Sequence, residues 1–428
     1  MKNKKIIIII GILLLLSILV ISIILLLPKK KKNNNNNSKP TSYEENNFNL
    51  NIIKTVNSTQ KDNYLISPYS IEIALNMLNE GANNNTKDEI EKVISIRKIN
   101  DVSIKNKIEI ANALFIKNDY KNSISKSFEN TIRKNYQGEV LYDKFTSPKV
   151  INDWVNNKTH KMIEKVVDEI SPDFVLGIAN ALAIDVEWLS PFECQNTNKA
   201  SFITDNNKEL KVEMMNQTFE GGTSYFETSN SKGIIIPYLG YDKNGKEDYE
   251  KGKQLEFIGI LPNKNINDFV ESLTEEELEE IDSKKELADE KLNINLYLPR
   301  FSYDFELENF SEILKVMGIK EVFNMNKADL TNMMTREEMQ KNNIDNLYVS
   351  TAVHKTHIEL NEMGTKAAAV TFFGIDKNSA IMQEPKKVTI KFNKPFLYII
   401  RDKETKEMLF FGVVKKPNIW KKTTCKEK

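Results

Sequence analysis

The chain has 428 residues, and its 60 Lys and Arg residues balance 60 Asp and Glu residues to a formal net charge of zero. This balance argues against a nucleic-acid-binding protein, because no excess of cations is available to replace condensed counterions. With only 15 Gly and 12 Pro residues, collagen-like and low-complexity chains are excluded, and 40% hydrophobic residues suffice for a sizeable core.

The first segment with a clear signal is residues 6–27, an apolar run interrupted only by one glycine and two serines. About 20 such residues cross the hydrocarbon core of a membrane. A cleaved signal peptide normally has a shorter apolar region followed by small residues, whereas bulky Ile and Leu precede Pro28 here. We therefore predict an uncleaved signal-anchor helix at 6–27 behind a basic n-region at 1–5, with secretion after cleavage as the alternative.

Lysines flank this run on both sides, so the positive-inside rule assigns no orientation. Residues 28–47 are predicted to be a polar spacer rich in Lys and Asn. No comparable linker follows, so we expect one large domain over residues 48–417 and a basic tail at 418–428. We place the domain on the extracellular or secretory-lumen side of a membrane, anchored through residues 6–27.

Helices are predicted mainly in the first half of this domain. Ser67 and Pro68 are a typical cap and first-turn proline for a helix that Gly81 ends. Thr86 is predicted to cap a second, short helix. A third apolar stripe covers residues 310–317, and the acidic residues 275–280 are expected to form a solvated helix face.

Strands are predicted mainly in the second half. Residues 292–298 alternate between apolar and polar side chains, as a half-buried antiparallel strand does. The other predicted strands are 255–261, 353–361, 388–392, 396–401 and 408–414, of which the last two are joined by a hairpin at 402–406. Helices followed by antiparallel strands indicate an α+β fold.

Residues that carry chemistry show no enzyme or metal signature. The two cysteines, Cys194 and Cys425, exclude a disulfide scaffold and Cys-rich metal sites, although a single bridge between them stays open. No His-Glu-x-x-His, Gly-x-Ser-x-Gly, Walker or Gly-x-Gly-x-x-Gly motif occurs. We therefore expect no cofactor, no metal and no catalytic residue. A membrane-bound hydrolase without a recognisable motif remains the enzyme alternative.

The segment 362–380 is the most informative part of the chain. If residues 365–371 formed a strand, Thr365, Ala367, Ala369 and Thr371 would share one face of small side chains, and Lys366 would lie on the other face. Such a segment can be exposed as a loop or inserted into a sheet. An Ala-rich helix start or an ordinary strand is the alternative interpretation.

The motif Glu362-x-Gly364-Thr365-x-Ala367-Ala368-Ala369 resembles the hinge of the serpin family. Residues 392–402 and 409–414 resemble the C-terminal signature of serpins. Further matches follow in the family's order at residues 67–70, 112–115, 151–155, 188–192 and 298–301. The resemblance extends over about residues 45–417.

This resemblance implies a metastable α+β fold with three β-sheets, about eight or nine helices and an exposed reactive-centre loop. The loop would act as a substrate for an endopeptidase of the serine or cysteine class. After cleavage, the segment from Thr365 onward would insert as a new strand into the central sheet and trap the protease as an acyl-enzyme. We expect a monomer, because nothing in this mechanism needs a second copy.

The resemblance also implies roles for particular residues. The hinge would comprise Glu362, Gly364, Thr365, Ala367, Ala368 and Ala369. The shutter, a polar cluster beneath the strands that must part, would comprise Ser67, Ser70, Asn180 and His354, and Trp188 would lie in the breach, where insertion begins. From the residues alone, His354 and Trp188 also fit ordinary core positions.

Counting along the hinge places the scissile bond at Asn378-Ser379, with Lys377-Asn378 as the alternative. Asn378 would suit an asparaginyl cysteine endopeptidase, and Lys377 a trypsin-like serine protease. Lys366 replaces the acidic residue that is usual in the hinge. A non-inhibitory serpin that serves as a carrier, chaperone or surface protein is the alternative function.

Overall fold

The structure of the chain is a computed structural model, and it describes residues 47–99, 103–365 and 384–418. The predicted anchor, nearly all of the spacer and the tail beyond residue 418 lie outside these ranges, as do Cys425 and residues 366–383 with the predicted scissile bond. Within the described ranges, no helix has the length and hydropathy of a membrane span.

The described ranges contain nine α-helices, in keeping with the eight or nine expected. They are α2 Phe48–Asn57, α3 Pro68–Gly81, α4 Asn84–Glu91, α5 Lys126–Tyr136, α6 Lys149–Lys158, α7 Ile266–Glu271, α8 Glu275–Ser283, α9 Phe310–Met317 and α10 Arg336–Lys341. Three 3₁₀ turns accompany them: η1 Asn118–Tyr120, η2 Cys194–Asn196 and η3 Glu321–Phe323.

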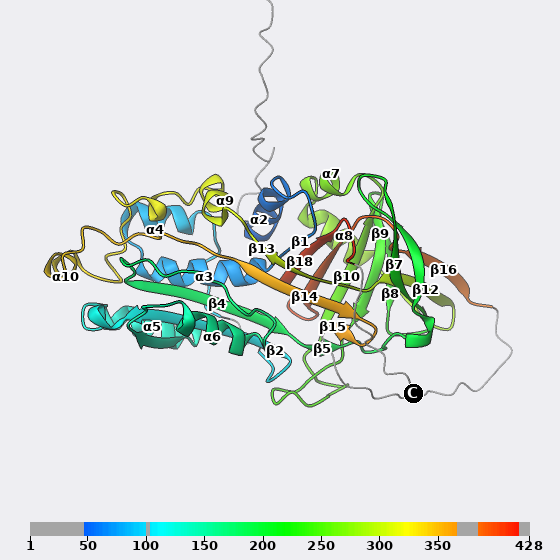
Figure 1. Cartoon of the computed structure of the whole chain (residues 1–428). Coiled ribbons are helices and arrows are strands. Elements are labelled where there is room, and N and C mark those ends of the chain that lie inside the picture. Colours follow the sequence, from blue (N-terminus) through cyan, green and yellow to red (C-terminus); the bar gives the residue numbers. More distant parts are fainter. Residues whose placement is uncertain (1–46, 100–102, 366–383, 419–428) are drawn as a thin grey trace, which may run out of the picture. The chain divides into compact units, whose positions relative to one another are not determined.

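Two sheets gather at one end of the molecule (Figure 1). The seven-stranded sheet has the order β1 Tyr64–Ile66, β18 Met408–Val414, β17 Phe396–Asp402, β10 Leu255–Pro262, β9 Ser231–Pro237, β8 Ser224–Glu227 and β11 Glu286–Leu287. The four-stranded sheet has the order β16 Lys386–Lys391, β12 Leu292–Pro299, β7 Glu209–Phe219 and β6 Asn198–Ile203.

The remaining strands form two ladders that belong to one central sheet. One ladder has the order β3 Glu139–Asp143, β2 Ile108–Lys117 and β4 Leu176–Ile184, and the other has the order β13 Phe301–Glu306, β14 Lys355–Asn361, β15 Gly364–Thr365 and β5 Val186–Glu187. Because only Asp185 separates β4 from β5 along the chain, β5 joins the two ladders. The three expected sheets are therefore present, with the central one divided.

Helix α3 lies at the centre of the fold and packs against both β4 and β18. Its predicted start is confirmed, since the Ser67 hydroxyl accepts a hydrogen bond from the Ser70 N–H and Pro68 occupies the first turn. Residues on several sides of the helix are buried, as packing between two sheets requires. The predicted strands and the 402–406 hairpin are also confirmed.

One local prediction is wrong, and another fails at a single residue. The cap of α4 is Asn83, and the hydroxyl of the buried Thr86 instead accepts a hydrogen bond from the Asp329 N–H. In α8, Glu277 is buried rather than solvated, and its carboxylate accepts hydrogen bonds from the Thr228 hydroxyl at 2.8 Å and the Asn230 amide at 2.8 Å. Both side chains accept hydrogen bonds from residues that are distant in the sequence.

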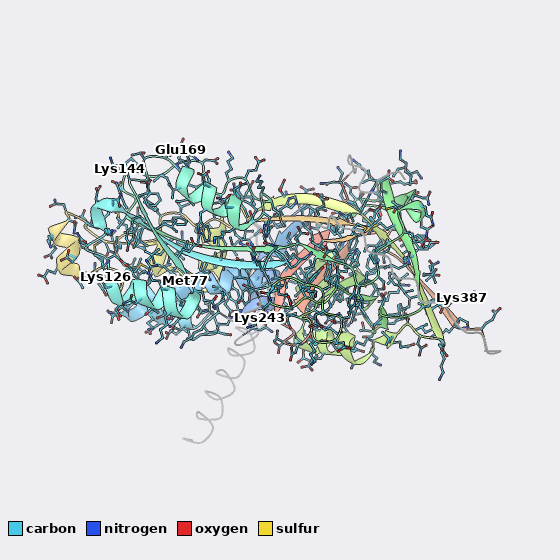
Figure 2. The ribbon with its side chains drawn as sticks, turned by 90° about the horizontal axis from the view of Figure 1, so that it is seen from below. Met77, Lys126, Lys144, Glu169, Lys243 and Lys387 are labelled. Atoms are coloured by element: carbon cyan, nitrogen blue, oxygen red, sulfur yellow. The ribbon has the colours of Figure 1, made fainter. Side chains whose placement is uncertain are left out.

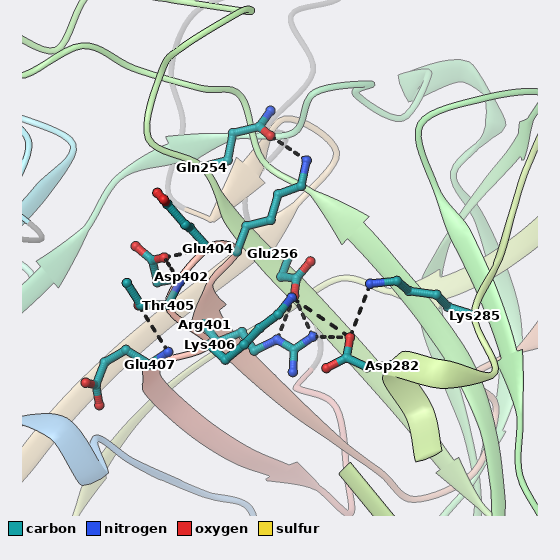
Figure 3. A network of polar contacts seen from close by, with 11 residues as sticks. Gln254, Glu256, Asp282, Lys285, Arg401, Asp402, Glu404, Thr405, Lys406 and Glu407 are labelled. Atoms are coloured by element: carbon teal, nitrogen blue, oxygen red, sulfur yellow. Dashed lines mark hydrogen bonds and ion pairs between the residues drawn. The ribbon is translucent and has the colours of Figure 1, made fainter. Parts of the chain in front are cut away.

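The β17–β18 hairpin is tied to β10 and α8 by a polar network (Figure 3). The buried guanidinium of Arg401 lies 2.6 Å from Glu256 and 2.7 Å from Asp282, and the Lys406 ammonium lies 3.2 Å from Glu256. Burial alone would raise the pKa of Asp282, but the hydrogen bond and charge of Arg401 outweigh it and hold that pKa below its ordinary value. Arg401 therefore compensates two carboxylates.

We expect Arg401→Met to lower the free energy of unfolding by about 3 kcal/mol, because Glu256 stays buried without its main partner. Urea unfolding followed by circular dichroism measures this loss. The exposed Lys403→Met is the control and should change stability by about 0.5 kcal/mol at most. Equal midpoints for the two variants would show that the network contributes no stability.

Candidate functional site

The most unusual feature of the central sheet is β15, in which the described part of the chain has two residues. Strand β15 pairs with β14 through Thr365 and Leu360 and with β5 through Thr365 and Val186. Beyond Thr365, β14 and β4 face each other without any strand pairing among the described residues. A strand that continued from β15 would have to enter between β14 and β4.

A pocket lies between β4 and β14 at this position. Its walls are residues 182–184 of β4 and 357–359 of β14, Thr365 lines it at the end where β15 stops, and Leu65, Ile400 and Phe410 contribute core side chains. The lining is mainly apolar. We call this position between β4 and β14 the strand slot.

The first hinge residues fit closely at the end of the strand slot. A Cβ atom on Gly364 would lie 2.2 Å from the carbonyl oxygen of Val186, so only glycine allows this approach. Thr365 is 2% exposed, and its hydroxyl lies 2.7 Å from the hydroxyl of Tyr238. The side chain of Thr365 therefore points into the protein.

Trp188 holds the turn between β14 and β15. Its indole N–H donates to the Asn361 carbonyl at 3.0 Å, and its backbone N–H donates to the Met363 carbonyl at 2.9 Å. The ring is buried and stacks on Tyr238 with a centroid distance of 4.4 Å. Trp188 thus contacts the chain at the point where the resemblance places the breach.

Glu362 is a buried carboxylate in the same turn, with an exposed fraction of 0%. It accepts hydrogen bonds from the Thr197 hydroxyl at 2.7 Å and from the Arg300 guanidinium at 3.1 Å. Arg300 is itself buried, and Glu213 lies 3.9 Å from it. Cys194 of the nearby η2 turn is disulfide-bonded, whereas Cys425 lies outside the described residues.

A second polar cluster links the two sides of the strand slot through α3. The Ser67 N–H donates to His354 Nε2 at 3.1 Å, next to β14, and the Ser70 hydroxyl donates to the Asn180 side chain on β4. Asn180 in turn donates to Asn112 on β2 at 2.8 Å. The four residues expected to form the shutter are therefore brought together, and Asn112 joins them.

His354 is a neutral member of this cluster. Its Nε2 accepts the Ser67 hydrogen bond, so that nitrogen carries no proton, and burial lowers the pKa of the imidazole to about 4. His357, three residues later, contacts Asp304 at 2.7 Å and is partly exposed. The two histidines point to opposite faces, as residues three apart in an extended segment do.

Four residues of the site did not follow from the sequence. Arg300, Thr197 and Tyr238 contact the hinge, and Asn112 extends the shutter cluster. Arg300 and Asn112 lie within the motifs at 298–301 and 112–115, and these motifs could have indicated them as site residues. Of the predicted hinge, Glu362, Gly364 and Thr365 are described, while Ala367, Ala368 and Ala369 lie outside the described residues.

We expect Glu362→Gln to lower the free energy of unfolding by about 3 kcal/mol, because the substitution leaves the buried Arg300 without its nearest negative charge. Denaturant unfolding of the purified chain measures this. The matched control is Glu359→Gln on the outer face of β14, where a loss of about 0.5 kcal/mol at most is expected. Equal losses would contradict a special role for the buried pair.

Stability should fall as the pH drops from about 6.5 to about 4, because His354 binds a proton in the unfolded chain over this window but not in the folded one. The sign follows from the lowered pKa of the folded state, and the loss amounts to about 3 kcal/mol. Urea midpoints at several pH values should show a weaker pH dependence for His354→Gln than for wild type. Parallel curves for wild type and His354→Gln would refute this assignment.

Comparisons with known proteins agree with this geometry. The family model described as serpin, or serine protease inhibitor, matches residues 43–417. Glia-derived nexin of Homo sapiens is 30% identical over 407 residues, which cover 88% of this chain and 94% of that protein. A serpin-like protein of Methanosarcina mazei is 30% identical over 380 residues, which cover 83% of this chain and 82% of that protein.

The fold also matches a solved serpin. The crystal structure of tengpin, a thermophilic serpin, in its native state superposes with a TM-score of 0.70 at 30% identity, and the match covers 89% of this chain and 97% of tengpin. The family is one of protease inhibitors and not of enzymes, so a membrane-bound hydrolase is set aside. With a family model that matches most of its length and a strand slot at its centre, the chain belongs to the serpin family.

Proposed function

We propose that this serpin inhibits an endopeptidase as a suicide substrate. The protease would cleave the loop after β15, and the freed segment would insert into the strand slot before the acyl-enzyme is hydrolysed. The observation that carries this proposal is β15, whose two residues already occupy one end of the strand slot.

The register of β15 indicates where later residues would lie after insertion. Since Thr365 pairs with Leu360 and Val186, each further residue would lie one position earlier on β14 and on β4. The inward positions would be flanked as follows: Ala367 by Ile358 and Ile184, Ala369 by Thr356 and Leu182, and Thr371 by His354 and Asn180. Small inward side chains suit this buried environment, and Thr371 would reach the shutter cluster.

The same register would also accommodate Lys366, the unusual residue of the hinge. Lys366 would point outward, between Glu359 of β14 and Asp185 next to β4. Where the family usually has an acidic residue, this chain would thus place a cation between two carboxylates. The substitution is therefore compatible with insertion.

Insertion would release free energy that the folded chain stores. A strand of about ten residues adds backbone hydrogen bonds worth about 0.5 to 1.5 kcal/mol each, or about 5 to 15 kcal/mol in total. This supports an irreversible trap. We assign Ser67, Ser70, Asn180 and His354 to the shutter, which must open during insertion, and Trp188 to the breach, while Glu362 marks the start of the hinge.

The target and the location are further parts of the proposal. Cleavage at Asn378-Ser379 would select an asparaginyl cysteine endopeptidase, and cleavage at Lys377-Asn378 a trypsin-like serine protease. Residues 6–27 would anchor the inhibitor in a membrane, with the domain on the extracellular or secretory-lumen side, or would be cleaved on secretion.

A non-inhibitory serpin is the second candidate function. Bulky or charged inward side chains in the hinge would favour it, because they oppose insertion. The small residues at Thr365, Ala367, Ala369 and Thr371 favour inhibition instead.

We expect the full chain in mild detergent to form a covalent adduct with at least one protease from a panel of trypsin-like, chymotrypsin-like, papain-like and asparaginyl enzymes. Denaturing gels reveal the adduct, and mass spectrometry locates the cleaved bond. Ala367→Arg should reduce the adduct yield more than about tenfold while cleavage continues, because insertion would bury an unpaired charge.

The matched control is Ala368→Arg, whose side chain would point outward and should leave the adduct yield nearly unchanged. If wild type is cleaved by every protease without an adduct and without a rise in thermal stability, the non-inhibitory function replaces this proposal. Equal adduct yields for the two arginine variants would refute the register of insertion.

A further inference from the structure

Strand β16 is an edge strand with an unusual concentration of lysines. It is the first described element after residue 383, and it pairs only with β12 among the described residues. Four of its six residues are exposed, including Lys386, Lys387 and Lys391. Figure 2 shows Lys387 at the end of the molecule opposite Lys126 and Lys144.

One face of β16 continues across β12. The parallel register places Lys387 beside Asn293, Thr389 beside Asn295, and Lys391 beside Tyr297. The residues of this set are at least partly exposed, and none is acidic. We call these six residues the β16 face.

The charge of the β16 face is uncompensated within the described part of the chain. Lys386, at its margin, has Glu286 at 3.7 Å, whereas neither Lys387 nor Lys391 has a described carboxylate within ion-pair distance. The Lys391 ammonium lies 4.8 Å from the centre of the Tyr297 ring, which offers no negative charge. A chain with zero net charge thus presents two lysines on one polar surface that have no carboxylate partner among the described residues.

If the protein inhibits a protease, the distance from the proposed scissile bond to the β16 face decides whether the bound protease can contact this face. The proposed scissile bond lies about eight residues before Lys386, a distance of at most about 29 Å along an extended chain. A protease domain of about 220 residues has a radius of gyration of about 17 Å and thus a diameter of about 44 Å. A protease bound to the loop therefore has surface within reach of the β16 face.

We infer that the β16 face is a docking surface for the target endopeptidase. It selects proteases whose surface is acidic next to the part of the active-site cleft that binds the residues following the cleaved bond. This inference rests on the proposed function. Lys387 and Lys391 would attract the acidic surface, while Asn293, Asn295 and Tyr297 offer hydrogen-bonding groups. Exposed charges of this kind act mainly on the association rate.

The test compares Lys387→Gln/Lys391→Gln with wild type, using the full chain in detergent and an anionic and a cationic trypsin that cleave after the same residues. The measured quantity is the second-order rate constant of loop consumption, counting adduct and cleaved chain together. With anionic trypsin at about 50 mM salt, we expect the double variant to react about fivefold more slowly than wild type. The difference should largely vanish at about 0.5 M salt and should be absent with cationic trypsin.

The matched control is Lys134→Gln/Lys144→Gln, which removes an exposed lysine of α5 and the exposed Lys144 that Figure 2 shows at the opposite end from Lys387, and it should leave the rate unchanged. Equal rates for wild type and the β16 double variant at low salt would overturn the inference, as would an equal loss in the control. Loss of binding to phosphatidylserine vesicles with an unchanged rate would assign the face to a lipid surface and also overturn it. If cleavage slows as expected but no adduct forms with any variant, docking holds and the trapping mechanism fails.

Discussion

The two backbone edges that face each other inside the central sheet are the constraint on which the rest of this structure depends. Strands β4 and β14 line the same pocket but do not pair with each other in the described part of the chain, where Gly364 and Thr365 pair with β14 and β5. Backbone N–H and C=O groups gain free energy when they pair with another strand. If a further strand entered between β4 and β14, as the proposed function requires, such pairing would release free energy.

Buried polar groups hold both ends of the strand slot, and they differ in charge. At the end where β15 stops, the buried side chain of Glu362 lies 3.1 Å from the Arg300 guanidinium, and this pair fixes the turn before β15. At the shutter, His354 is neutral and accepts its hydrogen bond from the first turn of α3. Because Ser67 contacts the β14 side and Ser70 the β4 side, separating these strands must disturb the start of α3.

The two ends of the stretch beyond β15 are attached to different sheets. Thr365 lies in the central sheet, whereas Glu384 leads into β16 of the four-stranded sheet. Cleavage between them would free the segment that follows β15 but leave β16 paired with β12. A docking surface on β16 would thus guide the first encounter and would not have to move during insertion.

Features that depend on neighbours in the chain were predictable from the sequence. The start of α3, the alternation of β12 and the hairpin at 402–406 follow from capping, period and turn chemistry within a few residues. The hinge motif also indicated Gly364 and Thr365. The carbonyl oxygen of Val186 approaches Gly364 too closely for a side chain, so this contact requires a glycine that is visible in the sequence. The parallel pairing of β12 with β16 was not predictable, since its partner lies about ninety residues away.

The contacts of polar side chains were decided only by the tertiary structure. Thr86 and Glu277 fit a cap and a solvated face locally, yet their partners lie 243 and 49 residues away. Likewise, His354 meets Ser67 across 287 residues, and Glu362 meets Arg300 across 62. The sequence by itself indicated the family and those helices and strands whose capping or periodicity is clear, because these depend on local pattern. The tertiary structure decided which buried charges and hydrogen-bonding groups meet, because such groups need a partner wherever the folded chain brings one within reach.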